Sequence, residues 1–245
     1  VKGGFRESGN DTNTTGKITL DGEDDTIPVF TMDAESDWSE IQLQQAELQG
    51  INLPARLMEG HVEVYNRKID DIGLFGQVRT DGSQKTRGLL NLTGISTAVA
   101  PAAAELLTGP ELYAQISGLI IRQWSNVLNT AAYKANVVLL PDDVYNLSTA
   151  LILNSAGSEM SVMSALRANY PGITFALTPK AQNVGGVSVS AAFSTNRRAM
   201  QFRLPVPLKI SSVSQRGFKY YVESYFGVAG LDLIETGSIA YLTGL

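Results

Sequence analysis

The segment GLLNLTGI, residues 88–95, stands between a helical part of the sequence and a mixed part that ends in strands. It is rich in leucine, and Gly88 and Gly94 stand near its two ends. Residues 72–100 around it lack a helical period, and the RTDG sequence at 79–82 is typical of a turn. We therefore predict a short strand that ends at Gly94.

Helices are predicted on both sides of that segment. Residues 39–71 read as a helix with Ser39 as its N-cap and a break at Gly50–Leu53. The clearest helix runs from Pro110 to about Asn129, with Thr108 as its cap. Its apolar stripe has the spacing of a helix packed on a core and consists of Leu112, Ile116, Leu119, Ile120, Trp124 and Val127.

The middle of the chain alternates between strands and helices. A strand at Asn136–Leu140 leads into a helix that opens with Pro141, and another helix covers about residues 159–169. Ile173–Leu177 is predicted to be a strand.

The last part of the chain has the period of β-structure. In MQFRLPVPLKI, residues 200–210, every second residue is apolar, and Pro205 and Pro207 lie on the opposite face. Because proline gives no hydrogen to a sheet ladder, this strand is predicted at an edge or against another chain. Phe218–Val228 and Ser238–Leu242 are predicted as further strands. The fold class is therefore α+β, without a linker that would separate independent domains.

Charge is unevenly distributed along the chain. Residues 1–40 hold ten acidic residues and only Lys2, Arg6 and Lys17 as basic ones, whereas residues 161–222 hold no Asp or Glu. The acid-free stretch carries eight basic residues: Arg167, Lys180, Arg197, Arg198, Arg203, Lys209, Arg216 and Lys219. It could be a solvated face, a surface toward nucleic acid, or an interface for the acidic front of another copy.

Composition excludes several classes of site. The chain has no Cys, which excludes disulfides and thiolate metal sites, and His61 is its only histidine, which argues against catalytic triads and multi-histidine metal centres. No apolar run is long enough to span a membrane, and no signal peptide is visible. The pI near 5.0 argues against general coating of nucleic acid.

Two candidate chemical sites fail on closer reading. The run from Asp11 resembles the start of an EF-hand, but its twelfth position is Gly22 rather than Glu. The cluster Asp21, Glu23, Asp24 and Asp25 could hold a cation or supply paired carboxylates, but a turn between two short strands offers no dry pocket. We expect this turn to be solvated or to meet a basic partner. His61 is predicted to pack rather than to react. No catalytic, cofactor-binding or metal-binding residue is predicted.

The order of elements resembles that of the major capsid proteins of tailed bacteriophages, the Hong Kong ninety-seven type fold that encapsulins share. The GLLNLTGI segment is similar to the "GL-N-GI" stretch that follows the long helix in this family. Val137–Tyr145 resembles the strand and helix of its middle domain, and Phe226–Gly244 its closing strands, although Gly237–Ala240 stands where a proline is common.

The resemblance implies an arrangement of domains. Residues 1–38 would form an N-terminal arm and an extended β-hairpin loop, and 39–96 the first part of a peripheral domain with its long spine helix. Residues 97–195 would form an axial α/β domain, and 196–245 the strands that return to the peripheral β-sheet domain. A chain that begins at Val1 is compatible with removal of a preceding segment by a maturation protease.

The resemblance also implies a structural role without a cofactor or a membrane. The expected function is to form hexamers and pentamers of an icosahedral virion shell, assembled in the host cytoplasm around double-stranded DNA, with portal, decoration or scaffolding proteins as further partners. The alternatives are an encapsulin-type compartment and a ligand-binding or hydrolytic α+β domain that uses Asp21–Asp25. The residues predicted to make contacts between subunits are Asp21, Glu23, Asp24, Asp25, Arg197, Arg198, Arg203 and Lys209.

Overall fold

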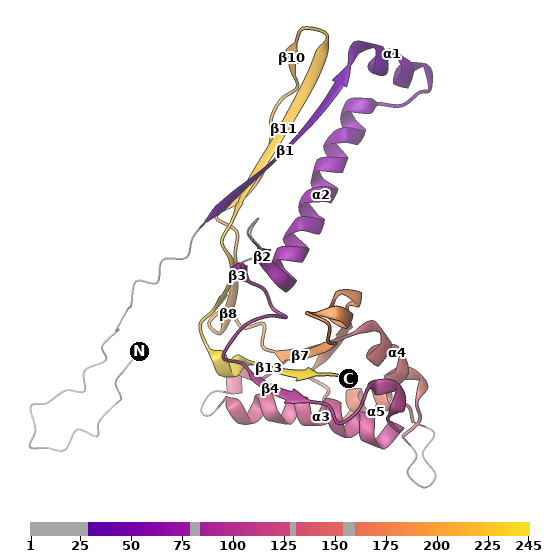
Figure 1. Ribbon diagram of the computed structural model, residues 1–245, viewed down its shortest axis with the longest axis vertical. Helices are drawn as coiled ribbons and strands as arrows, with labels where there is room; N and C mark the ends of the chain where they lie inside the picture. The colour runs from indigo at the N-terminus through magenta and orange to yellow at the C-terminus, as the bar shows by residue number, and fades with distance from the viewer. Residues whose placement is uncertain (1–28, 79–83, 128–130, 154–159) are drawn as a thin grey trace, which may run out of the picture.

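The computed structural model describes residues 29–78, 84–127, 131–153 and 160–245. It has two lobes (Figure 1). The elongated lobe is built from a long β-ribbon with a helix beside it, and the compact lobe from a sheet covered by helices. The four short 3₁₀ helices are η1 (Ala104–Leu106), η2 (Ala131–Tyr133), η3 (Pro179–Asn183) and η4 (Thr236–Ser238).

A five-stranded sheet forms the centre of the compact lobe. Its order is β4 (Ser96–Val99), β13 (Ile239–Thr243), β7 (Val189–Phe193), β5 (Val137–Leu140) and β6 (Thr174–Leu177). The outer pairs β4–β13 and β5–β6 are parallel, and the inner pairs are antiparallel.

Both faces of this sheet are buried, because successive residues of each strand point to opposite sides. Val138 and Leu140 face the core made with α3 (Gly109–Asn126), α4 (Asp142–Ala150) and α5 (Val162–Asn169). Leu139 belongs to a second core on the opposite face, together with Leu89 and Tyr241. The helix predicted at Pro110–Asn129 is confirmed as α3, and its predicted start is confirmed by a capping box between Thr108 and Glu111.

The elongated lobe is a β-ribbon supported by one long helix. β1 (Phe30–Ser39) pairs with β11 (Lys219–Val228) along its whole length, and β11 also pairs with β10 (Ser214–Arg216) and β9 (Val206–Ile210). The chain turns at the tip through α1 (Glu40–Leu48) and returns through α2 (Leu53–Phe75). The predicted break between these helices and the Ser39 cap are confirmed.

Two small β-pairs lie between the lobes. β2 (Gly76–Val78) pairs with β3 (Gln84–Arg87), and β8 (Met200–Arg203) pairs with β12 (Gly230–Leu233). The single strand predicted over 200–210 is therefore wrong, because the chain leaves one pairing at Leu204–Pro205 and enters another as β9. The edge position is confirmed, since β11 is the only described partner of β9.

The last strand belongs to the compact lobe. β13 pairs with β7 and β4 in the compact lobe, so residues 196–245 do not all return to the elongated lobe. Its residues from Ile239 to Leu242 are all buried, and such a strand needs a covered sheet on both faces. The ribbon of the elongated lobe is not covered on both faces, so it offers no position for such a strand.

The segment at 88–95 is not a strand, which makes that prediction wrong. It completes the end of α2 instead. The last carbonyl groups of a helix have no partner within it. Here the N–H groups of Leu89 and Leu90 donate to the carbonyls of Gly73 and Leu74, both at 2.8 Å, and Asn91 Nδ2 donates to the carbonyl of Phe75 at 2.6 Å. The segment is therefore the C-terminal cap of α2.

The same segment is fixed to the compact lobe. The hydroxyl of Tyr241 in β13 donates to the carbonyl of Leu89 and accepts from the N–H of Leu92 at 3.3 Å. Burial raises the pKa of this hydroxyl. The cap thus joins the spine of one lobe to the central sheet of the other.

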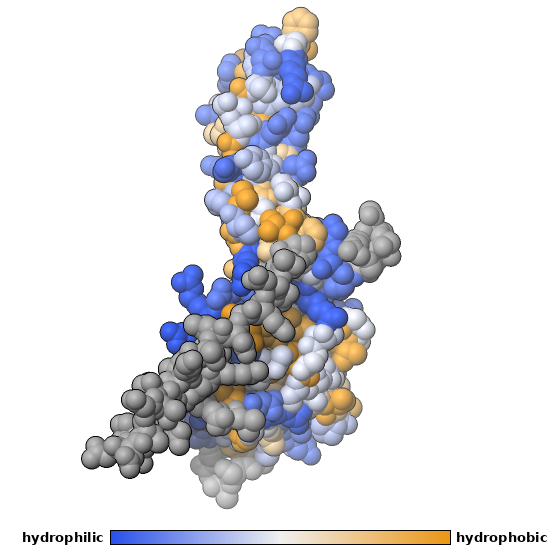
Figure 2. All heavy atoms as spheres, turned by 90° about the vertical axis from the view of Figure 1, so that its left-hand side faces the viewer, coloured by the Kyte–Doolittle hydropathy of each residue, from blue (hydrophilic) through white to orange (hydrophobic). Residues whose placement is uncertain are grey.

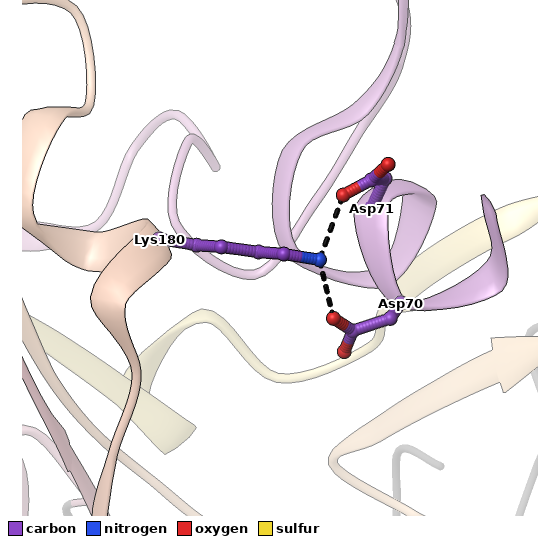
Figure 3. A network of polar contacts seen from close by, with 3 residues as sticks. All are labelled: Asp70, Asp71 and Lys180. Carbon is purple, nitrogen blue, oxygen red and sulfur yellow. Dashed lines mark hydrogen bonds and ion pairs between the residues drawn. The ribbon is translucent and has the colours of Figure 1, made fainter. Parts of the chain in front are cut away.

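An ion-pair cluster bridges the lobes beside this cap (Figure 3). Lys180 Nζ of η3 lies 2.5 Å from Asp70 Oδ2 and 2.7 Å from Asp71 Oδ1, near the end of α2. Hydrogen bonds to Asp70 and Asp71 raise the pKa of Lys180 above its ordinary value of 10.5.

Gly88 is the position where the cap tolerates no side chain. A Cβ atom there would lie 2.3 Å from the carbonyl carbon of Leu74 and 2.4 Å from the amide nitrogen of Gly76, both of which are backbone atoms. We predict that Gly88→Ala lowers the free energy of unfolding by more than about 2 kcal/mol, measured by urea unfolding of the unassembled subunit. Gly60→Ala within α2, where nothing lies within 4 Å, is the control and should be neutral or stabilising. Equal losses in both variants would contradict the close approach at Gly88.

The Lys180 cluster predicts that the free energy of unfolding depends on pH in the alkaline range. Because the folded state raises the pKa of Lys180, its contribution is complete below the ordinary pKa of 10.5 and is lost as the pH rises above it. The three side chains are at least one third exposed, so Lys180→Met should cost at most about 1 kcal/mol at neutral pH and progressively less as the pH rises above 10.5. Lys68→Met on α2, where Lys68 has no ion pair within the described residues, should show no such dependence. A pH-independent difference for Lys180→Met would contradict the assignment.

Candidate inter-subunit surfaces

The acidic half of the predicted contact lies outside the described residues. Asp21, Glu23, Asp24 and Asp25 all fall within 1–28, as does the short strand predicted at 17–20; of the strand predicted at Thr26–Phe30, only residues 29 and 30 are described, and Phe30 begins β1. The part of the four acidic residues in any contact remains a prediction.

Arg197 and Arg198 lie in the exposed turn between β7 and β8. Asn196 fixes this turn, because its Oδ1 accepts from the N–H of Arg198 at 3.0 Å and its Nδ2 donates to the carbonyl of Ala132 at 3.0 Å. Neither arginine makes an ion pair with another described residue. Two guanidinium groups are thus held at the surface next to the junction of the lobes, and both are free to meet an acidic partner.

Arg203 and Lys209 are engaged within their own chain. Arg203 Nη2 in β8 lies 2.5 Å from Asp232 Oδ2 in the paired strand β12. Lys209 Nζ lies 5.8 Å from the centre of the Tyr225 ring, across the pair β9–β11. The structure therefore does not bring the four predicted basic residues together as one free patch.

His61 packs between α2 and the ribbon, as predicted. Its side chain is buried, and Nδ1 lies 2.7 Å from Ser224 Oγ of β11, while Nε2 has no hydrogen-bond partner. The ring belongs to a pocket of about 380 Å³ between β1 and α2 that Met32, Tyr65 and Phe226 also line. Among the described residues, His61 is hydrogen-bonded only to Ser224 and to no acidic or basic side chain. The His61–Ser224 pair therefore offers no acid–base relay.

The face of the ribbon away from α2 carries exposed charged groups that the sequence reading did not single out. Glu35 of β1 stands directly opposite Glu223 of β11, and like charges in such positions repel. Nearby, a hydrogen bond from Lys219 lowers the pKa of the Asp37 carboxyl, at an Nζ–Oδ2 distance of 2.9 Å. Alternation of acidic and other residues in FTMDAESDWS, residues 30–39, was the available signal for this strand.

The tip of the elongated lobe combines exposed apolar side chains with a groove. Phe218 in the turn between β10 and β11 is 82% exposed, and Leu48 of α1 is 89% exposed. The groove has a volume of about 810 Å³ and lies between α1, α2 and the end of β1. Figure 2 shows apolar atoms at the very end of this lobe, above a mostly polar shaft.

No metal or membrane function is supported by the described residues. They contain no group of three or more His, Cys, Asp or Glu side chains that could hold a metal ion. None of their helices combines the length and apolar character that crossing a membrane requires.

Comparison with known proteins gives the family of the chain. The model of the family described as major capsid protein matches residues 7–245. The capsid of Myoviridae phage XM1 is 62% identical, with a TM-score of 0.86 over 100% of this chain and 83% of that chain. No curated protein matches.

More distant structures show the fold alone. The capsid of a native GTA particle is 12% identical, with a TM-score of 0.65 over 98% of this chain and 80% of that chain. The holo-SrpI encapsulin complex from Synechococcus elongatus PCC 7942 is 11% identical, with a TM-score of 0.54 over 89% and 74% of the two chains. The predicted α+β fold of the Hong Kong ninety-seven type is confirmed. The chain belongs to the major capsid protein family and is a structural protein of a tailed-phage head, not an enzyme.

Proposed function

We propose that copies of this capsid protein form the hexamers and pentamers of an icosahedral head that encloses double-stranded DNA. The observation that carries the proposal is the 62% identity to a phage capsid over the whole chain. The exposed arginine turn, the bare ribbon face and the apolar tip are consistent with a subunit that buries much of its surface against other copies. Assembly would take place in the host cytoplasm, with portal, scaffolding or decoration proteins as additional partners.

The two lobes correspond, in this proposal, to the axial and peripheral domains. The compact lobe would be the axial domain near the centre of each capsomer, with β4 and β13 included in it. The elongated lobe would be the peripheral domain. Residues 1–38 would supply the arm and the extended loop. The last part of this segment, from Phe30 onward, belongs to β1.

Arg197 and Arg198 are the best candidates for the charged contact between subunits. They would receive the acidic segment Asp21–Asp25 of a neighbouring copy, since they are exposed and without an acidic partner among the described residues. Arg203 and Lys209 would contribute less, because both already interact within the chain. Other parts of the basic stretch would face the packaged DNA without sequence preference.

The encapsulin alternative has weaker support. The encapsulin structure is 11% identical to this chain, which speaks for a shared fold, whereas the phage capsid is far closer in sequence. The contents of the shell distinguish the two functions, because a phage head holds DNA and a compartment holds protein. Family membership excludes the hydrolytic alternative that would use Asp21–Asp25.

The direct test is electron microscopy of the full chain purified from an expression host. We expect closed shells made of hexamers and pentamers, and nuclease-protected DNA in shells that are filled by the packaging machinery of the phage. Monomers under every salt and crowding condition would contradict shell assembly, and protein cargo without DNA would favour the encapsulin function.

Charge reversal tests the arginine turn. Arg197→Glu combined with Arg198→Glu should leave the fold intact and reduce the yield of shells at about 0.1 M salt, because like charges would then face the acidic segment. The charge-retaining pair Arg197→Lys and Arg198→Lys is the control and should assemble nearly as well as the native chain. Light scattering gives the yield and circular dichroism the fold. Equal yields for the Glu and Lys variants would contradict the contact.

A further inference from the structure

The tip of the elongated lobe presents an aromatic side chain that the chain itself does not cover. Phe218 follows Gly217, whose φ of +65° gives the tight turn between β10 and β11. The ring is 82% exposed, and it is not among the residues that line the groove of its own subunit. Arg216 and Lys219 flank it, and because Lys219 already pairs with Asp37 of its own chain, Arg216 supplies the positive charge of this apolar projection.

The helix next to this turn also lacks a cover. α1 has nine residues, none of them buried, and Ile41 and Leu48 are 68% and 89% exposed. A capping box between Ser39 and Gln42 fixes its first turn. Helices this short are not stable without packing, so α1 needs a contact that its own chain does not provide.

The groove between α1 and α2 has the properties that would receive such a projection. Its lining includes apolar side chains of Trp38, Ile51, Leu53 and Leu57. Trp38 is buried in the wall and stacks on Tyr220 with 6.0 Å between ring centres. The volume of about 810 Å³ is ample for a phenylalanine side chain and the turn that carries it.

The charges of the groove are opposite to those of the turn. Asp37, Glu59 and Glu63 line the groove, with Arg56 as its single basic residue. Glu63 pairs with Arg67 and Asp37 with Lys219, which leaves Glu59 without an ion pair among the described residues. A projection that carries Arg216 therefore finds an apolar wall and, at Glu59, an acidic side chain that is available to pair with it.

We propose that Phe218 of one copy inserts into the α1–α2 groove of a second copy, so that the tips of elongated lobes interlock. The proposal rests on the proposed function, since the shell is what places several tips together. The turn and the groove are different surfaces of the same tip, so two copies can exchange them across a twofold axis, or more copies can close into a ring. In such a closed arrangement every Phe218 is inserted, every groove is occupied, and α1 is covered in each copy.

The absence of cysteine allows a direct test. Phe218→Cys combined with Gly60→Cys places one thiol on the turn and one in the groove, where a side chain at position 60 meets nothing within 4 Å. After mild oxidation, shells of this variant should give disulfide-linked dimers and larger species on a non-reducing gel. Unassembled subunits should stay monomeric. The matched control, Leu106→Cys with Gly60→Cys, pairs the groove with an exposed site on the compact lobe and should not link.

A second variant measures the strength of the contact. Phe218→Ala removes an exposed side chain, so the isolated subunit should melt as the native one does. The protein concentration needed for half-maximal assembly should rise about tenfold or more, because the variant buries one aromatic ring less per contact. Leu106→Ala is the control for loss of an exposed apolar side chain elsewhere.

The possible outcomes separate this proposal from the proposed function. If native shells form, but the cysteine pair stays unlinked in shells of normal shape and Phe218→Ala assembles at the native concentration, the interlocking of tips is wrong while the capsid function stands. If the native chain forms no shells under any condition, the proposed function itself fails. Linked species in shells together with impaired assembly of Phe218→Ala support the proposal.

Discussion

The structure depends on how the last carbonyl groups of α2 are satisfied. This helix is the support of the elongated lobe, and its end points into the junction between the lobes. The N–H of Gly76 donates to the carbonyl of Ile72, and Leu89, Leu90 and Asn91 supply donors for the next three. Because Tyr241 of the compact lobe holds Leu89 and Leu92, the helix end, the cap and the central sheet form one hydrogen-bonded unit.

The two lobes are stabilised in different ways. The compact lobe buries two apolar clusters, one on each face of its sheet. The elongated lobe has a third cluster with only Ile72, Phe226 and Val228 as buried members, and several of its apolar side chains face solvent. A lobe with so little core relies on its long backbone ladder and, in the shell, on other copies.

Local patterns predicted much of the fold. The predictions failed where the structure of a segment depends on its contacts with residues far away in the sequence. Helix α3 was predictable because Thr108, Pro110 and a regular apolar stripe all mark it. β7 was missed because VSAAF is buried on both faces and shows no alternation. The leucines of segment 88–95 predict a strand, yet its donors go to carbonyls of α2 that lie 16 residues earlier in the sequence. Charge patterning indicated Arg197, Arg198 and Arg203 alike as contact candidates, but it could not show that Asp232 pairs with Arg203, since that pairing depends on the strand order of β8 and β12.

The ribbon of the elongated lobe has two edges of different character. β1 has ten residues and pairs only with β11 among the described residues, whereas β9 on the opposite side is five residues long, follows Pro205 and contains Pro207. A foreign strand could extend the sheet at the first edge but finds few donors at the second. Sheet growth from one copy to the next therefore stops after one addition. For a protein that must reach very high local concentrations before its shell closes, this asymmetry is a safeguard against fibrous polymers.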